Sequence, residues 1–312
     1  MVAFGNAISG RGTNDSMNAD RELAIEMLFS PDREVRDLLL RISPDRSEWA
    51  VIRRECETAI NGFMSVGADG VPAQQGHIES VEKVGGRSKN FDFEGKFETS
   101  SGKEVRLKIE LKRGESIYDQ PQFLQLYARD GEMVTNKSPS YAEWFYDNYL
   151  KTVVRLAGTS TPPKQEYLRK CCGTNYEVFP HTKVLYERLE AGESVAATKL
   201  KEIAYESIDS YLAALETRPA LVDLAAIQAR LDQQIGKLFL SWDPFRKKFA
   251  VEVFSAAAMR LSGAISFKRR PTGERSCLVV TNQAGHPIEA LLRWKNRSCL
   301  LGPAWQISLK SA

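Results

Sequence analysis

The chain has 312 residues, of which 43% are hydrophobic and 27% are charged, and its formal net charge is +3. These fractions are typical of folded globular proteins and argue against a disordered or membrane-embedded chain. The small net charge excludes a polycation that binds nucleic acid by overall charge alone. No apolar run approaches the roughly 18 residues that cross a bilayer, and the N-terminus lacks the layout of a secretion signal. Because the five cysteines also lack a regular spacing, we expect an intracellular protein of the cytoplasm or nucleus, not secreted and without membrane contact.

The first 46 residues are expected to form an N-terminal arm followed by packing helices. Residues 1–19 are rich in Gly, Asn and Ser, which favours a loose arm. Apolar residues at helical spacing predict one helix over about 20–29 and a second after Pro31. A longer helix over about 47–64 and a strand over about 77–84 open the next segment.

Two segments that alternate apolar and polar residues predict a β-hairpin over residues 91–112. The apolar residues of each strand share one face: Phe91, Phe93 and Phe97, then Val105, Leu107, Ile109 and Leu111. A three-residue loop, 100–102, keeps both apolar faces on the same side, because Gly102 supplies the left-handed conformation that its last position needs. This register places Glu94 opposite Lys108 and Asp92 opposite Glu110.

The pairing of Asp92 with Glu110 sets two acids against each other, which destabilises a sheet unless a cation lies between them. Two carboxylates, a main-chain carbonyl and waters are the hard oxygen ligands that Mg²⁺ prefers. Lys112 follows Glu110 by two residues and therefore points to the same place. The alternative interpretation is a solvated sheet face whose acids and bases simply pair across the strands.

Asp92 followed by Glu110-Leu111-Lys112 resembles the motif of the PD-(D/E)xK nuclease superfamily, an acid on one strand and E-x-K on the next. The resemblance covers about residues 47–130. It implies an α/β fold with a mixed sheet, built as a restriction-endonuclease-like αβββαβ core. It also implies Mg²⁺ or Mn²⁺ held by Asp92, Glu110 and the carbonyl of Leu111, with Lys112 orienting or deprotonating the attacking water.

The same resemblance assigns roles to residues on both sides of the motif. The helix before the strands lends an acid to the metal site in this superfamily, and Glu57 is preferred to Glu55 for that role. The segment after the motif resembles the helix that supplies Gln and Tyr in RecB-like and lambda-exonuclease-like members. Gln122, Gln125 and Tyr127 are the corresponding candidates.

The remaining chain is expected to add a helical subdomain over 139–241 to the nuclease-like core of 47–138, and a β-rich segment over 242–312 that completes the sheet. Short basic clusters in that last segment are candidates for phosphate contact. Their residues are Arg246, Lys247, Lys248, Lys268, Arg269 and Arg270. Solvated surface charge is the alternative reading of these clusters.

These observations predict a metal-dependent nuclease that hydrolyses phosphodiester bonds. Because most members of the resembling superfamily cut DNA, analogy favours DNA over RNA as the partner. Endonuclease and exonuclease action stay open, and a symmetric double-strand cutter would need a homodimer. The competing hypothesis is a non-catalytic nucleic-acid-binding or protein-interaction module on a nuclease-like scaffold.

Overall fold

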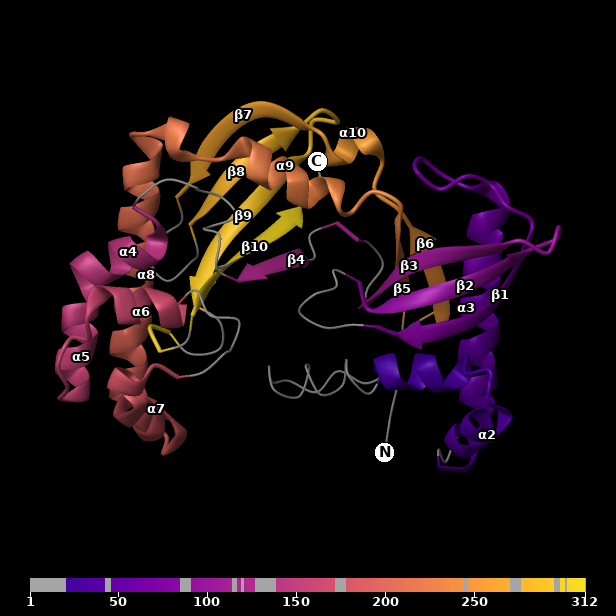
Figure 1. Ribbon diagram of the computed structural model, residues 1–312, viewed down its shortest axis with the longest axis horizontal. Helices are drawn as coiled ribbons and strands as arrows, with labels where there is room; N and C mark the ends of the chain where they lie inside the picture. Colours follow the sequence, from indigo (N-terminus) through magenta and orange to yellow (C-terminus); the bar gives the residue numbers. More distant parts are fainter. Residues whose placement is uncertain are drawn as a thin grey trace. The chain divides into compact units, whose positions relative to one another are not determined.

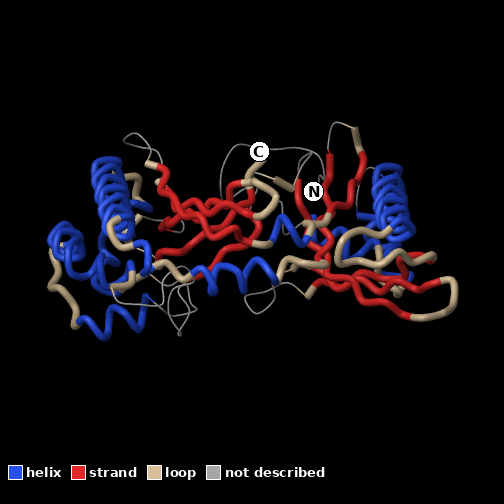
Figure 2. Tube along the Cα trace, turned by 90° about the horizontal axis from the view of Figure 1, so that it is seen from above, coloured by secondary structure: helices blue, strands red, loops and turns tan. Residues whose placement is uncertain are grey.

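The computed structural model describes residues 21–42, 46–84, 91–113, 117–118, 121–126, 139–171, 178–243, 246–269, 276–294, 298–300 and 302–311. Contacts divide the chain into two compact units (Figure 1). The first comprises Met1–Ile117 and Asp232–Met259, and the second comprises Tyr118–Leu231 and Arg260–Ala312. Each unit contains one five-stranded sheet (Figure 2). Within the ranges above, no helix is both long enough and apolar enough to cross a membrane.

The first unit combines a mixed sheet with helices. Its elements are a helix over 21–28, α2 (Arg33–Ile42), α3 (Arg46–Val66), β1 (Gly76–Lys83), β2 (Phe93–Thr99), β3 (Glu104–Arg113), β5 (Lys237–Asp243), β6 (Lys248–Glu252) and α10 (Ala256–Met259). The strand order is β1-β2-β3-β5-β6. All neighbours are antiparallel except β3 and β5, which run parallel. The chain leaves the sheet after β3 and returns at β5.

The apolar face of this sheet packs against α3. Trp49, Ile52 and Ile60 of the helix share one buried cluster with strand residues such as Phe93 and Ile109. The alternation read from the sequence is therefore confirmed, since alternate residues of β2 and β3 enter this core. The opposite face carries the charged residues of both strands.

The β2–β3 hairpin has the predicted register. Glu94 pairs with Lys108, and the ladder extends from Glu98 opposite Glu104 to Phe93 opposite Ile109. The loop is the predicted three-residue one, closed by a hydrogen bond of 2.9 Å from the Thr99 N–H to the Lys103 carbonyl. Gly102 has a φ of 77°, in the left-handed region. Loop length and side-chain alternation thus fix the same register.

The second unit places helices beside an antiparallel sheet. Its strands are β4 (Pro121–Leu126), β7 (Leu261–Lys268), β8 (Cys277–Asn282), β9 (Pro287–Trp294) and β10 (Pro303–Leu309), in the order β4-β10-β9-β8-β7. Its helices are α4 (Tyr141–Phe145), η1 (Tyr146–Leu150), α5 (Lys151–Ala157), α6 (Lys164–Cys171), η2 (Pro180–Thr182), α7 (Lys183–Glu190), α8 (Ser194–Glu216), η3 (Pro219–Leu221) and α9 (Leu224–Asp232). Helix α8 lies against β7 and β9 (Figure 1).

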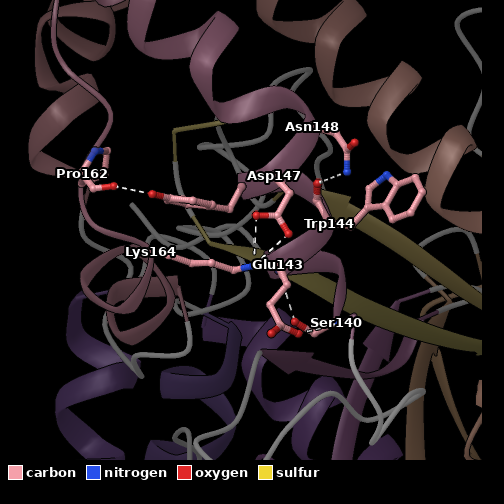
Figure 3. Close-up of polar contacts among 8 residues, drawn as sticks. Ser140, Glu143, Trp144, Asp147, Asn148, Pro162 and Lys164 are labelled. Atoms are coloured by element: carbon pink, nitrogen blue, oxygen red, sulfur yellow. Dashed lines mark hydrogen bonds and ion pairs between the residues drawn. The ribbon is translucent and has the colours of Figure 1, made fainter.

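The continuous run α4–η1–α5 contains one turn of π-helix, η1. Ser140 caps its start by a reciprocal pair of hydrogen bonds with Glu143. Figure 3 shows this cap together with the ion pair from Lys164 to Asp147, at 2.8 Å. Trp294 of β9 donates a hydrogen bond of 2.9 Å to the Tyr141 hydroxyl, which ties the helix to the sheet.

Three predicted segment assignments are wrong. The C-terminal strands do not complete the first sheet, because β7 to β10 form a second sheet with β4. The predicted helical subdomain ends too late, because residues 237–243 are strand β5 of the first sheet. The predicted core extends too far, because residues from Tyr118 onward belong to the second unit. The general class, a mixed α/β protein, is confirmed.

We expect Gly102→Ala to lower the free energy of unfolding by about 1 kcal/mol, because alanine resists the left-handed conformation at this position. An added Cβ has open space around it, so the loss reports backbone strain alone. Urea unfolding monitored by circular dichroism measures it. Gly62→Ala on α3 is the matched control, and we expect it to gain roughly 0.5 to 1 kcal/mol from helix propensity. Equal effects of the two substitutions would contradict the loop conformation.

Candidate active site

The charged face of the first sheet gathers an acid pair and two lysines where β2, β3 and β5 meet. Glu110 and Lys112 are alternate residues of β3, so both lie on the face opposite α3. In the parallel pairing with β5, Lys108 is opposite Lys237 and Glu110 is opposite Phe239. Lys237 therefore lies beside Glu110, one strand away.

Asp92 reaches this site through its side chain. The regular ladder of β2 stops at Phe93, and the Asp92 N–H donates to the carbonyl of Ile109 at 3.0 Å. The sequence predicted that Asp92 pairs directly opposite Glu110. The observed ladder ends one residue earlier, so this direct pairing is absent. The Asp92 Oδ2 instead accepts a hydrogen bond of 2.9 Å from the N–H of Leu111. This bond places the carboxylate beside the E-x-K segment.

The environment of Asp92 disfavours its charged form. Burial raises its pKa from the ordinary value of 3.8 to about 6, and the negative charge of Glu110 acts in the same direction. The Leu111 N–H and the Lys112 ammonium act against this rise, whereas the charge of Glu22 adds to it. Two carboxylates thus lie close enough in this site for each charge to oppose the other.

Glu110 is 9% exposed and is held by both lysines. Lys112 donates to its Oε1 and Lys237 donates to its Oε2. Lys237 is fully buried, and its ammonium also lies 4.9 Å from the centroid of the Phe239 ring. Burial lowers the pKa of Lys237. Phe239 packs edge-on against Phe254 at 4.9 Å, which forms an apolar wall on the β5 side.

Sequence reasoning missed Lys237 because this residue falls within the helical subdomain predicted over 139–241. The helix α9 ends at Asp232, and Gly236 has a φ of 72°, a left-handed conformation that ends helices. The following run, KLFLSWD, is wholly buried. A glycine followed by a short run of strand-forming residues was therefore the signal that separated helix from strand.

The predicted acid from α3 is placed elsewhere. Glu57 forms an ion pair with Arg53 of the same helix at 2.8 Å, and α3 covers the apolar face of the sheet, away from the charged one. The helix residue whose charge acts on Asp92 is Glu22, from the helix over 21–28. Glu22 pairs with Lys83 of β1 at 2.9 Å. Glu55, the other candidate, lies beside Arg54.

The described part of the segment after the motif includes a strand, β4, over Pro121–Leu126. Gln122 and Gln125 lie in strand β4, which pairs with β10 in the second unit. The prediction that they lie on a helix is therefore wrong. Pro121 suits an edge strand, and β4 does lie at a sheet edge. Tyr127 lies outside the described residues.

The basic candidates fall into two separate groups. Arg246, Lys247 and Lys248 are exposed at the turn between β5 and β6, where Arg246 pairs with Asp243 at 3.4 Å. In the second unit Lys268 pairs with Glu289 at 3.3 Å, and Arg269 pairs with Glu216 at 2.8 Å. Arg270 lies outside the described residues.

We expect Asp92→Asn to stabilise the metal-free protein at neutral pH. The folded state holds a proton on Asp92 up to about pH 6 and the unfolded state only to about 3.8, so ionisation costs stability as pH rises through this window. Well above pH 6, ionisation of Asp92 lowers the free energy of unfolding by about 3 kcal/mol in total. Urea unfolding in EDTA at pH 4.5 and 7.5 measures the gain, which should appear mainly at pH 7.5.

The matched control is Glu94→Gln on the same strand. Glu94 pairs with Arg106 at 3.0 Å, so its neutralisation removes an ion pair and should bring no gain. An equal gain in both variants would show a general charge effect and would contradict the local cause assigned to Asp92.

We expect Glu110→Gln to lower the free energy of unfolding by about 3 kcal/mol, because it leaves the buried Lys237 ammonium without its counter-charge. Lys237→Met in that background should recover at least about half of the loss, since no buried charge then remains. A double-mutant cycle in urea measures this coupling. Additive effects within about 0.5 kcal/mol would contradict it.

The site thus joins Asp92, Glu110 and Lys112 as the motif requires, and adds Lys237. Within the described residues no group of three or more His, Cys, Asp and Glu side chains is arranged to hold a metal ion. The oxygen donors at hand are the two carboxylates and nearby main-chain carbonyls, which suit a hard cation that keeps several waters. A scan against protein-family models, a search of curated proteins and a search of solved structures each found no match.

Proposed function

We propose that this protein is a metal-dependent nuclease that hydrolyses phosphodiester bonds, with DNA favoured by analogy. The observation that carries the proposal is the convergence of Asp92, Glu110 and Lys112 in one half-buried site. The order α3, β1, β2, β3 and then a strand parallel to β3 supports the helix, three strands, helix, strand core that the motif implies. Helix α9 precedes that parallel strand in the chain, but all of it except Asp232 belongs to the second unit, so the support comes from α3 and the four strands.

The residues present fit a divalent cation. The raised pKa of Asp92 reflects burial beside a second carboxylate, and a cation between the two would offset both effects. Asp92, Glu110 and the Leu111 carbonyl would hold Mg²⁺ or Mn²⁺. Bound there, such an ion polarises a phosphoryl oxygen and makes a bound water more acidic.

Lys112 is the protein group that acts on the substrate in this proposal. Its side chain is 15% exposed, whereas that of Lys237 is fully buried, so Lys112 is the more accessible of the two lysines bound to Glu110. From there it can donate hydrogen bonds to the phosphate and stabilise the negative charge that develops during water attack. Asp92 and Glu110 keep their position through the Leu111 N–H and the Lys237 ammonium.

One observation favours the alternative, a non-catalytic module. Lys112 and Lys237 both bind Glu110, which neutralises this acid without any metal ion. A buried ion triad of this kind occurs in scaffolds as well as in enzymes. The two hypotheses differ over Asp92, which a structural triad does not need.

We expect the wild type to cut nucleic acid with Mg²⁺ or Mn²⁺ and not with EDTA. Asp92→Ala and Lys112→Ala should each reduce the rate at least about 100-fold, because the first removes a ligand of the metal ion and the second removes the ammonium that stabilises the developing charge. Linear, circular and single-stranded DNA and RNA are the substrates, with cleavage followed on gels. Cutting of the circle identifies endonuclease action.

Lys108→Ala is the matched control, because Lys108 is an exposed cation two residues before Glu110 on the same strand face. It should retain cleavage within about two-fold if charge on this face alone contributes little. Failure of the wild type to cut any substrate, or equal cutting by all variants, would favour the non-catalytic module.

A further inference from the structure

Lys237 is the more deeply buried of the two lysines that bind Glu110. It is fully buried at the first position of β5, with its ammonium against the Phe239 ring and bonded to Oε2 of Glu110. The strand pairing holds its main chain opposite Lys108. The main chain of Lys237 is thus held by the strand pairing, and its ammonium is held by Glu110.

The two lysines bind different oxygens of Glu110. Lys237 binds Oε2 with its side chain wholly buried, and Lys112 binds Oε1 with its side chain 15% exposed. One contact is thus at the base of the site and the other at its accessible side. The two oxygens of the carboxylate thus bind lysines of different exposure.

We propose that Lys237 is a positioning residue, which commits Oε2 of Glu110 and leaves Oε1 as the oxygen available to a divalent ion. The inference rests on the proposed nuclease function. When Oε1 binds an ion, Lys112 is the lysine that leaves Glu110 and becomes available to the phosphate. In this proposal the Lys237 ammonium stays on Glu110, and the Lys112 ammonium moves.

A purely structural role explains the buried lysine less well. Phe239 and Phe254 pack next to it, so an apolar residue at position 237 would fit these surroundings at no desolvation cost. An apolar residue would leave Glu110 with Lys112 as its counter-charge, and that lysine would then be held on the oxygen that the ion needs. Lys237 removes this conflict.

Charge and position predict opposite effects on metal binding. If Lys237 acts only through its charge, its removal makes the site more negative and divalent ions bind more tightly. If Lys237 acts through position, its removal lets Glu110 turn toward Lys112 and divalent ions bind more weakly. The direction of the change in Kd therefore separates the two roles.

The test titrates the EDTA-treated, dialysed full chain with Mn²⁺ in a calorimeter and compares Lys237→Met, Lys237→Gln and Lys108→Met. We expect about ten-fold weaker binding by Lys237→Met and a similar loss of cleavage rate. Lys237→Gln is also neutral but keeps a donor for Oε2, so it should recover part of the affinity. Lys108→Met should bind within two-fold of the wild type.

Each other outcome contradicts the inference in a distinct way. Unchanged or tighter Mn²⁺ binding by a folded Lys237→Met variant would overturn the positioning role while leaving the nuclease proposal intact. Equal affinity of the Met and Gln variants would do the same. Absence of Mn²⁺ binding by the wild type would overturn both proposals. Urea unfolding in EDTA verifies that each variant is folded.

Discussion

The buried ion pair between Glu110 and Lys237 joins two strands whose residues are 127 positions apart in the chain. Most of the second unit lies in this interval, so the first sheet is complete only when β5 pairs with β3. Leu238 and Leu240 contribute apolar surface to the α3 side of the sheet. Lys237 and Glu110 pair on the opposite face of the sheet, because a buried ammonium is tolerated only beside a carboxylate. One interaction therefore links β5 to the acid at the centre of the site.

Alternation and loop chemistry made the hairpin predictable. Phe93 and Phe97 of β2 and Leu107 and Ile109 of β3 alternate with charged residues and enter the core, and a one-residue slip would bury the charged set. The three-residue loop with Gly102 at its end agrees with that register, so two independent local signals coincide. The helical subdomain predicted over 139–241 likewise contains the helices α4 to α9.

Long-range partners were not predictable in the same way. Nothing local distinguishes a strand that joins the first sheet from one that joins the second, so β7 to β10 were assigned to the wrong sheet. Glu57 lies on a helix at the expected place in the order, yet that helix covers the apolar face. The contact of Asp92 was not predictable either. The ladder of β2 ends before this residue, and its side chain accepts a hydrogen bond from the Leu111 N–H in place of the expected direct pairing.

Asp92 is the residue over which the proposed metal site and a purely structural ion triad differ in energy. Glu110 already has two ammonium partners, so adding a second buried carboxylate brings like-charge repulsion and a desolvation cost, visible as the raised pKa of Asp92. A fold selected only for stability would gain by replacing Asp92 with a neutral residue that still accepts from the Leu111 N–H. Costs of this kind are concentrated at functional sites, where a ligand of opposite charge offsets them when it binds. The unfavourable placement of Asp92, more than the favourable pairs of Glu110, is therefore the feature that supports a divalent cation at this site.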